Sequence, residues 1–272
     1  LDLITLAMTM AYRGGVNYAD TFGTVQIWDS IIYRLLNKMH VAIPPRRKQH
    51  KVKFPGAFVK DPHVGMHEWV ASFDLNSLYP NLIVQYNMSI ETKLPGRIPG
   101  VDVESILNGT NTLNKDDTTM SATGIRFTKE RQGIIPAIIK KYYDERREIK
   151  NEMLKTQQLM QKGSTLELEA KDNQLQNQQM SIKILMNSLY GALGNAGFRY
   201  FDNDVAEAIT TSGQLSIRWA EKAINAEMNN LLETLNEDYV IAIDTDSLYV
   251  NMKALVDKYK PKDPVKFLDK IC

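Results

Sequence analysis

The sequence predicts an α+β protein with a mostly antiparallel sheet, helices packed on it, and a projecting antiparallel pair of long helices. Three observations lead to this prediction. A short strand-like run occurs before residue 80, two further β-type runs flank an acidic turn near residue 245, and long helical stretches lie between them. Helices and strands are thus segregated along the chain, which is the pattern of an α+β fold.

The composition is that of an ordinary soluble protein. Of the 272 residues, 43% are hydrophobic and 24% are charged, which suffices for one large domain or two modest ones. No apolar run approaches the roughly 18 residues of a membrane span, and the N-terminus has no signal-peptide pattern. The chain lacks a starting Met, so we expect it to be part of something longer. The single Cys272 excludes an intrachain disulfide, and the four histidines form no zinc pattern.

The first 40 residues are predicted to be mostly helical. Apolar residues recur at i, i+4, i+5 and i+8 from Ile27, which marks one face of a helix. Pro44-Pro45 then ends the helical pattern and opens a loop. Residues 70–75 form a short apolar and aromatic run, broken by Ser72, that is typical of a strand and carries Asp74 near its end.

The loop after Pro45 is strongly basic, although the net charge of +1 gives no global sign of nucleic-acid binding. Residues 30–60 contain no Asp or Glu. Such a one-signed stretch fits a track for a phosphate backbone, and it fits a solvated basic loop equally well. Its basic side chains are Arg34, Lys38, Arg46, Arg47, Lys48, Lys51, Lys53 and Lys60.

Long helices are predicted over residues 134–162 and 165–190, with a break at Gly163-Ser164. Pro136 is tolerated in the first turn of its helix. Two long helices around one short break indicate an antiparallel hairpin, and its Gln-rich faces indicate that much of it is solvated. A Gly- and aromatic-rich segment over 191–203 precedes an amphipathic helix over 204–235, whose apolar positions, Trp219 among them, are expected to pack under a sheet.

Near the C-terminal end, two β-type runs at 239–243 and 247–250 flank Asp244-Thr245-Asp246, which predicts a β-hairpin with carboxylates at its tip. Two carboxylates so close repel unless a cation lies between them. Magnesium prefers hard oxygen ligands, and Asp74 at the end of its own strand is the best candidate for a third carboxylate. The alternative is ordinary turn chemistry, because Asp favours turns and caps.

Three segments, in this order, resemble the polymerase motifs of family B DNA polymerases. They are Ser72-Phe-Asp-Leu-Asn-Ser-Leu-Tyr-Pro-Asn-Leu-Ile83, Lys183-Ile-Leu-Met-Asn-Ser-Leu-Tyr-Gly-Ala-Leu-Gly194, and Asp244-Thr-Asp-Ser247 followed by Leu-Tyr-Val. Pro55-Gly-Ala-Phe-Val59 and Phe198-Arg-Tyr-Phe201 further resemble the T-even-like bacteriophage branch. The family usually has Tyr-Gly before the acidic triplet, where this chain has Ala242-Ile243. The resemblance covers nearly the whole chain.

This resemblance implies the fold and the domain boundaries. The sheet with its packed helices would be the polymerase palm, in two parts over 46–133 and 192–272, and the helical hairpin over 134–191 would be the fingers. Residues 1–45 would be a remnant of the N-terminal and exonuclease region. The proofreading exonuclease and the thumb would lie outside this chain, so we expect neither here.

The resemblance also implies a DNA polymerase that adds deoxynucleotides to a primer 3′-hydroxyl with two Mg²⁺ ions. Asp74 and Asp246 would be the principal metal ligands, the Leu75 carbonyl a further oxygen, and Asp244 an auxiliary carboxylate. The ring of Tyr79 would lie beneath the incoming sugar and block a 2′-hydroxyl.

Other matching positions imply contacts with the nucleotide and the DNA. The backbone at Ser77 and Leu78 would touch the triphosphate, and the resemblance assigns phosphate-binding cations to Arg146, Lys150 and Lys183. Without the resemblance, the sequence favours another interpretation, in which Arg146 and Lys150 belong to a salt-bridged helix face with Asp144, Glu145 and Glu148. Asn187 would line the nascent base pair, and the DNA contacts would be Tyr190, Gly191, Arg46, Arg47, Lys48, Lys51 and Lys53.

The implied partners are primer-template DNA, deoxynucleoside triphosphates and a sliding clamp reached through a C-terminal segment outside this chain, without a membrane. The implied setting is phage DNA replication in the cytoplasm of an infected bacterial host. Two alternatives remain open at this point. One is a DNA- and nucleotide-binding fragment that is inactive without a separate thumb and exonuclease chain. The other is a different two-metal enzyme such as a nuclease, although a nuclease needs neither a sugar gate nor a triphosphate clamp.

Overall fold

A computed structural model describes residues 2–46, 50, 52–111 and 117–272 of the chain. Its elements follow one another along the chain in the order α1 (Leu3–Gly14), η1 (Tyr18–Phe22), α2 (Thr24–Lys38), β1 (Val59–Lys60), β2 (Val70–Asp74), α3 (Leu78–Tyr86), β3 (Lys93–Arg97), α4 (Val103–Leu107), β4 (Thr118–Met120), β5 (Ile125–Thr128), α5 (Ile134–Lys162), α6 (Leu166–Leu193), α7 (Asn203–Leu232), β6 (Val240–Asp244), β7 (Ser247–Asn251), α8 (Lys253–Tyr259) and α9 (Pro264–Ile271).

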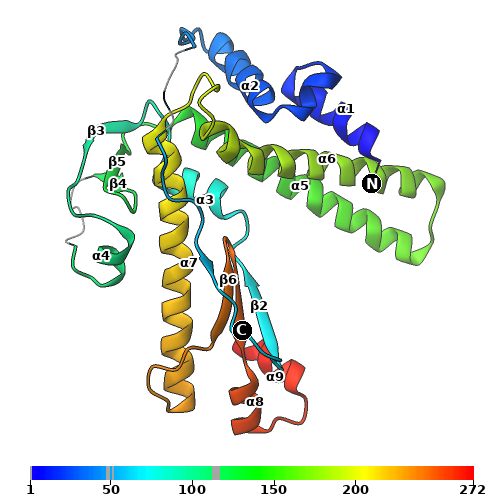
Figure 1. The fold of residues 1–272 in the computed structure, drawn as a ribbon. Helices are drawn as coiled ribbons and strands as arrows, with labels where there is room; N and C mark the ends of the chain where they lie inside the picture. The colour runs from blue at the N-terminus through cyan, green and yellow to red at the C-terminus, as the bar shows by residue number, and fades with distance from the viewer. Residues whose placement is uncertain (1, 47–49, 51, 112–116) are drawn as a thin grey trace.

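The strands form two antiparallel sheets, so the predicted α+β class is confirmed. The larger sheet has the order β1-β6-β7-β2, and the smaller one has the order β3-β5-β4. The larger sheet lies alongside the lower half of α7, while the smaller sheet lies beside its upper half (Figure 1). The sequence predicted β2, β6 and β7 to within one residue at each end, and it did not predict the smaller sheet.

The predicted helical hairpin is confirmed as α5 and α6, which pack along each other and extend away from α7 and the two sheets (Figure 1). Its first helix has the predicted bounds, and its second runs three residues beyond Tyr190. Lys171 on α6 forms an ion pair with Glu152 on α5 at 2.8 Å. One side of α6 is not solvated, because α1 and α2 pack against it.

The first core joins α2 to the bases of α5 and α6 and to the start of α7. Trp28 of α2 is fully buried there, and its indole nitrogen donates hydrogen bonds to the Leu185 carbonyl (3.2 Å) and the Ser188 hydroxyl (3.1 Å) of α6. Burial of this aromatic ring with its polar atom satisfied anchors the N-terminal helices on the hairpin.

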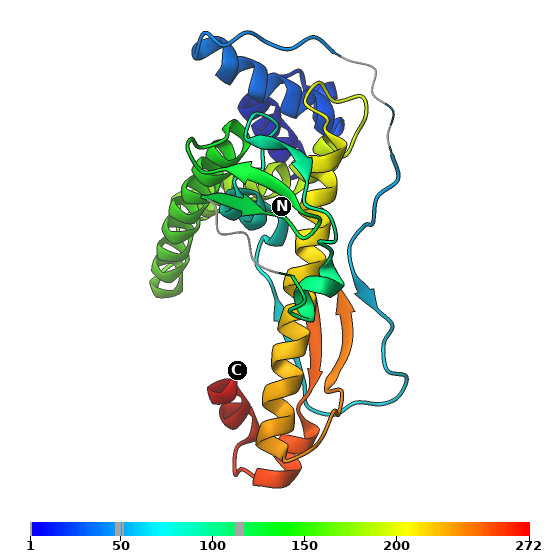
Figure 2. The same cartoon turned by 90° about the vertical axis from the view of Figure 1, so that its left-hand side faces the viewer.

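The second core lies between the larger sheet and the C-terminal half of α7, which therefore ties the two cores together (Figure 2). Ile217 of α7 is fully buried against the sheet residues Val240 and Leu248. The expectation for Trp219 is wrong, because its side chain is 61% exposed. At about 100° per residue, two residues beyond Ile217 lie on the opposite side of the helix. No helix in the described ranges is long and apolar enough to cross a membrane.

Candidate active site

The acidic turn lies at the tip of the β6–β7 hairpin. Asp244 pairs with Ser247 across the ladder, which leaves Thr245 and Asp246 as the two turn residues. Thr245 has φ 57°, an unfavourable region for a β-branched residue. Its amide donates a hydrogen bond to the Phe58 carbonyl at 3.0 Å, and the Asp246 amide donates to the Asp244 carbonyl at 2.6 Å. These bonds hold the strained turn.

Asp74 reaches this turn because β2 pairs with β7. Asp74 lies opposite Ser247 in the register, and the Ser247 hydroxyl donates to the Asp74 carboxylate at 3.3 Å. The Leu75 amide donates to the Asp246 carbonyl at 2.8 Å. The predicted meeting of Asp74 with the acidic turn is therefore present in the structure.

Negative charge gathers at the tip of the hairpin. Burial raises the pKa of Asp246 above its ordinary value, and the carboxylates of Asp74 and Asp244 raise that pKa further. Among the residues that the structure describes, no group of three His, Cys, Asp or Glu side chains is placed to hold a metal. The carboxylates at the tip are therefore close enough to raise the pKa of Asp246, but they do not form a complete set of metal ligands by themselves.

A cleft of about 300 Å³ opens beside Asp74 and Asp246. Its walls come from three parts of the chain: the hairpin tip, the turn from β2 with the first turn of α3, and the C-terminal half of α6. The residues that line it are Asp74, Asn76, Ser77, Leu78, Tyr79, Pro80, Lys183, Asn187 and Asp246. Seven of these nine, all except Asn76 and Pro80, are site residues predicted from the sequence.

The floor of the cleft is the start of α3. Ser77 takes a left-handed conformation with φ 54°, and its hydroxyl donates to the Asn76 side chain at 3.1 Å. The Asn81 side-chain amide fixes the same turn by donating to the Asn76 carbonyl at 2.8 Å. Among the described residues, no side chain caps this helix end by a hydrogen bond.

Tyr79 is held between two elements. Its ring centroid lies 4.8 Å from that of Tyr190 on α6, with the planes tilted by 34°. On α7, a Cβ at Gly213 would come within 2.8 Å of the ring. Burial raises the pKa of Tyr79 to about 12, with smaller effects from Tyr190 and Asp246, so the phenol stays neutral at physiological pH.

The predicted phosphate-binding cations divide into two groups. Lys183 is exposed and lines the cleft together with Asn187, one turn further along α6. Arg146 and Lys150 lie on α5 and do not line it. Gly191, predicted as a DNA contact, is exposed on α6 just beyond Tyr190.

The alternative of a salt-bridged face for Arg146 and Lys150 is not what the structure shows. Asp144 pairs with Arg147 at 3.5 Å, and Glu145 pairs with Arg13 of α1 at 2.8 Å. Within the described residues, neither Arg146 nor Lys150 forms an ion pair, and the Arg146 Nε atom is buried without a hydrogen-bond partner.

The predicted basic track is only partly described. Arg47, Lys48 and Lys51 lie outside the described residues. Lys53 is exposed, whereas Arg46 pairs with Asp29 of α2 at 3.0 Å. Lys60, from the same basic stretch, is used internally: it bonds Glu221 and Asp238, each at 2.6 Å.

Three residues at the site are not predicted from the sequence: Asn76, Pro80 and Gly213. The first two sit inside the motif that contains Tyr79, so their position was available. Gly213 stands alone in the middle of a long helical pattern, and an isolated helical glycine often has a packing reason.

Strand-end acids of the antiparallel sheet thus share a cleft with a lysine from the long helix pair. A family model described as "DNA polymerase family B" matches residues 23–260. The chain belongs to this family.

Its relatives include phage and archaeal enzymes. A "DNA-directed DNA polymerase" of Escherichia phage RB69 is 32% identical over 99% of this chain and 35% of its own length. One of Enterobacteria phage T4 is 32% identical over 94% of this chain and 33% of its own length. The solved family B DNA polymerase of Pyrobaculum calidifontis has a TM-score of 0.60 at 24% identity, covering 94% of this chain and 30% of that one. This chain thus spans about a third of these relatives.

Proposed function

We propose that this chain is the core of a template-directed DNA polymerase, which adds deoxynucleotides to a primer 3′-hydroxyl in phage DNA replication. The observation that supports this most is the composition of one cleft. Asp74 and Asp246 share it with the ring of Tyr79 and with Lys183. Transfer of a selected nucleotide from its triphosphate to the primer hydroxyl, with pyrophosphate leaving, needs these three things together: ligands for metal ions, a wall for the sugar and a cation for the phosphates.

The donor set at the cleft fits magnesium. Asp74 and Asp246 offer carboxylate oxygens, the Leu75 carbonyl offers a neutral oxygen, and Asp244 adds negative charge behind them. Burial, and then the charges of Asp74 and Asp244, raise the pKa of Asp246, and a divalent cation bound here would offset that negative charge. Two Mg²⁺ ions bound here would activate the primer hydroxyl and stabilise charge on the leaving group.

The residues of the chain bind and select the nucleotide. Lys183 places a point charge at the phosphates, and the amides of Ser77 and Leu78 offer donors at a helix N-terminus. The Tyr79 ring, held by Tyr190 and Gly213, blocks a 2′-hydroxyl and so favours deoxynucleotides.

The helix pair supplies the remaining contacts. Arg146 and Lys150 face the phosphates once α5 and α6 close over a correct nucleotide, a gating motion that places them at the cleft they do not line in this structure. Asn187 and Tyr190 line the nascent base pair, with Gly191 beside the DNA.

We assign residues 134–191 to the fingers, 46–133 and 192–272 to the palm, and 1–45 to the edge of an N-terminal and exonuclease region. Primer-template DNA would contact the basic loop through Lys53 and Arg46, with Arg47, Lys48 and Lys51 between them. A sliding clamp is the proposed further partner, and the cytoplasm of the bacterial host is the proposed setting.

Primer extension with Mg²⁺ tests the metal assignment. Asp246→Asn keeps the shape of the side chain and removes its charge, so incorporation should fall on the order of a hundredfold or more. Asp257→Asn is the control, because Asp257 is an exposed carboxylate of α8 that pairs with Lys253. Undiminished incorporation by Asp246→Asn would overturn the assignment of Asp246.

The chain covers only about a third of the length of its relatives, which favours a second candidate function. In this function the chain is a DNA- and nucleotide-binding fragment that is inactive alone. This candidate predicts salt-dependent DNA binding without incorporation, and incorporation when a chain with the missing parts is added. If the wild type extends primers alone, this second candidate is wrong. Degradation of DNA in place of extension would favour a nuclease.

A further inference from the structure

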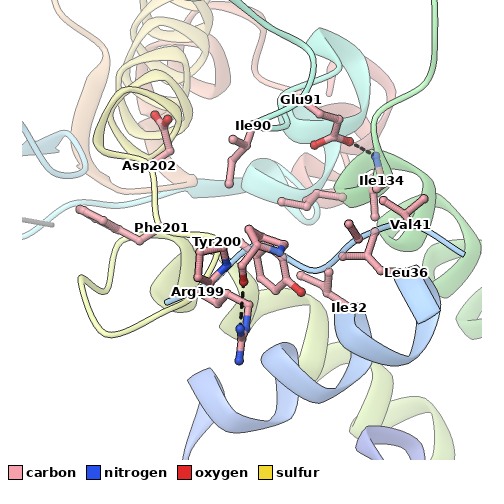
Figure 3. Close-up of a pocket in the computed structure, with 14 residues that line it drawn as sticks. Ile32, Leu36, Val41, Ile90, Glu91, Ile134, Arg199, Tyr200, Phe201 and Asp202 are labelled. Atoms are coloured by element: carbon pink, nitrogen blue, oxygen red, sulfur yellow. Dashed lines mark hydrogen bonds between the residues drawn. The ribbon is translucent and has the colours of Figure 1, made fainter. Parts of the chain in front are cut away.

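Two cavities border different faces of α2, and they differ in charge. The cavity drawn in Figure 3 meets the helix at Ile32 and Leu36, and its charged side chains have partners, as where Arg199 donates to Asp29 at 3.1 Å. The second cavity, of about 400 Å³, lies between α2, the end of α1 and the first turns of α5. It shares no lining residue with the candidate active site. Its size is within the range of small-molecule sites, about 300–1,000 Å³.

The wall of this second cavity is strongly basic. Of the nine described residues that line it, four are basic, none is acidic, and five are apolar or aromatic. Arg13 is neutralised by Glu145 at 2.8 Å. The other three, Arg34, Lys38 and Lys141, are exposed and form no ion pair with any other described residue. The cavity therefore holds three positive charges that the described part of the protein leaves uncompensated.

The three cations come from two helices that meet at the cavity. Arg34 and Lys38 are four residues apart on α2, and Lys141 lies on α5. A side chain at Gly15, where φ is 63°, would collide with the Arg34 guanidinium, so this glycine leaves room for it at the end of α1. Like charges four residues apart on a helix are destabilising, and a bound anion would remove that cost.

The charges also act on the aromatic wall. Burial raises the pKa of Tyr142, whereas the positive charges of Arg13 and Arg34 oppose that rise. Both guanidinium groups are thus close enough to Tyr142 to influence it. The buried side chains of Ile31 and Ile138 form the apolar part of the wall, where charges attract an anion more strongly than they would in open water.

The number of uncompensated cations indicates the class of anion. A single phosphate group carries about two negative charges at most, so it would leave one of the three cations uncompensated. A chain of two or three phosphates matches all three. Lysine provides a point charge for phosphate, and arginine provides a fork of N–H donors.

A nucleic-acid strand fits this cavity less well. Surfaces that bind single strands combine a basic groove with aromatic faces on which the bases stack. In the part of the wall that the structure describes, Tyr142 is the one aromatic residue, and its half-buried ring lies 6.1 Å from that of Trp28. The cavity therefore offers sites for phosphates without a platform for bases.

We propose that this cavity is a non-catalytic binding site for a small polyphosphate, either free or as part of a nucleoside di- or triphosphate, held by Arg34, Lys38 and Lys141. The inference goes beyond the proposed function and does not depend on it, because the two sites share no residue.

Acetylation footprinting of the wild-type chain, read by mass spectrometry, tests the location. EDTA is present, so that no metal ion carries the probe to the carboxylates of the cleft. Saturating tripolyphosphate should slow acetylation of Lys38 and Lys141 at least about threefold, because the bound form is protected. Lys140 should be unaffected, since it is an exposed neighbour on α5 that does not line the cavity. Equal protection by dATP would assign the site to nucleotides as well as free polyphosphate, and deoxyadenosine, which has no phosphate, should protect neither lysine.

Calorimetric titration with tripolyphosphate tests the charge. Lys141→Glu should weaken binding at least about tenfold by reversing one of the three cations. Lys140→Glu has the same net charge and should weaken binding less than about threefold, because salt screens exposed charges outside the cavity. The proposal is overturned if tripolyphosphate does not bind, if the two variants weaken its binding equally, or if it protects Lys183 in the cleft and not Lys141. It is also overturned if only single-stranded DNA protects Lys38 and Lys141, or if deoxyadenosine protects them as well as dATP does.

Discussion

Replacing Gly213 by Ala sets a gain in helix stability against a clash with Tyr79. A glycine in a helix interior is about 1 kcal/mol less favourable than alanine. At this position, however, the new Cβ would lie 2.8 Å from the Tyr79 Cε1 atom, whereas ordinary contacts begin at 3.4 Å. The ring must therefore retreat by about 0.6 Å, and overpacking of this kind costs about 1–3 kcal/mol. We expect Gly213→Ala to lower the free energy of unfolding by about 0–2 kcal/mol.

A double-mutant cycle isolates this clash. With Tyr79→Ala already present, the obstacle is gone, and Gly213→Ala should then stabilise the chain by up to about 1 kcal/mol. Urea unfolding of the four proteins gives a coupling energy that we expect to be about 1–3 kcal/mol. Gly191→Ala calibrates the helix term, because Gly191 lies in α6 with nothing within 4 Å of its added Cβ.

The same displacement reaches the proposed chemistry. A retreat of about 0.6 Å by the ring that supports the sugar should reduce kcat/KM for deoxynucleotide incorporation roughly tenfold. Equal effects of Gly213→Ala on the free energy of unfolding in the two backgrounds would refute the reasoning, because they would mean that the ring and α7 are not in contact.

Three further outcomes follow from named contacts. Lys93→Met should lower the free energy of unfolding by about 1 kcal/mol at pH 7. Lys93 pairs with Asp204 and helps to hold the pKa of Asp204 in the folded protein below its ordinary value, so the loss of stability should shrink as the pH falls through that lowered pKa. A loss that does not change with pH in chemical denaturation would contradict this prediction. Lys183→Ala should raise KM for the nucleotide about tenfold in steady-state extension, whereas Lys171→Ala on the same helix should not; equal effects would contradict the phosphate role. Trp28→Phe should cost about 1–3 kcal/mol in urea unfolding by removing a buried donor, and no loss would mean that its bonds to α6 contribute nothing.

The long elements of this fold could be predicted from the sequence because their periodicity is local. The helix over 134–162 has the predicted bounds, and Gly163 ends it as expected. The smaller sheet could not be predicted, since its strands are three to five residues long and join residues from 93 to 128. The burial of α7 was predicted only in part: Ile217 packs on the sheet, and Trp219 is exposed by the turn of the helix.

For the candidate site, the residues could be chosen from sequence motifs, but their proximity could not. Asp74 and Asp246 meet through strand pairing that spans most of the chain. The different placement of Lys183 and Arg146 relative to the cleft depends on how two helices face each other, which spacing along one helix does not determine. The role of Gly213 depends on the packing of α7 against Tyr79, which the sequence does not determine.

The pairing of β2 with β7 has a consequence for how the protein folds. The Ser247 hydroxyl reaches the Asp74 carboxylate across 173 positions of chain, with the helix pair and α7 lying between them in sequence. Contacts of such long range form slowly, because loop-closure entropy must be met before the pairing is rewarded. Helices such as α5 and α6 can form from neighbouring residues early. We therefore expect Asp74 to join Asp244 and Asp246 late in folding, so that a partly folded chain has its helical hairpin before it has the complete acidic site.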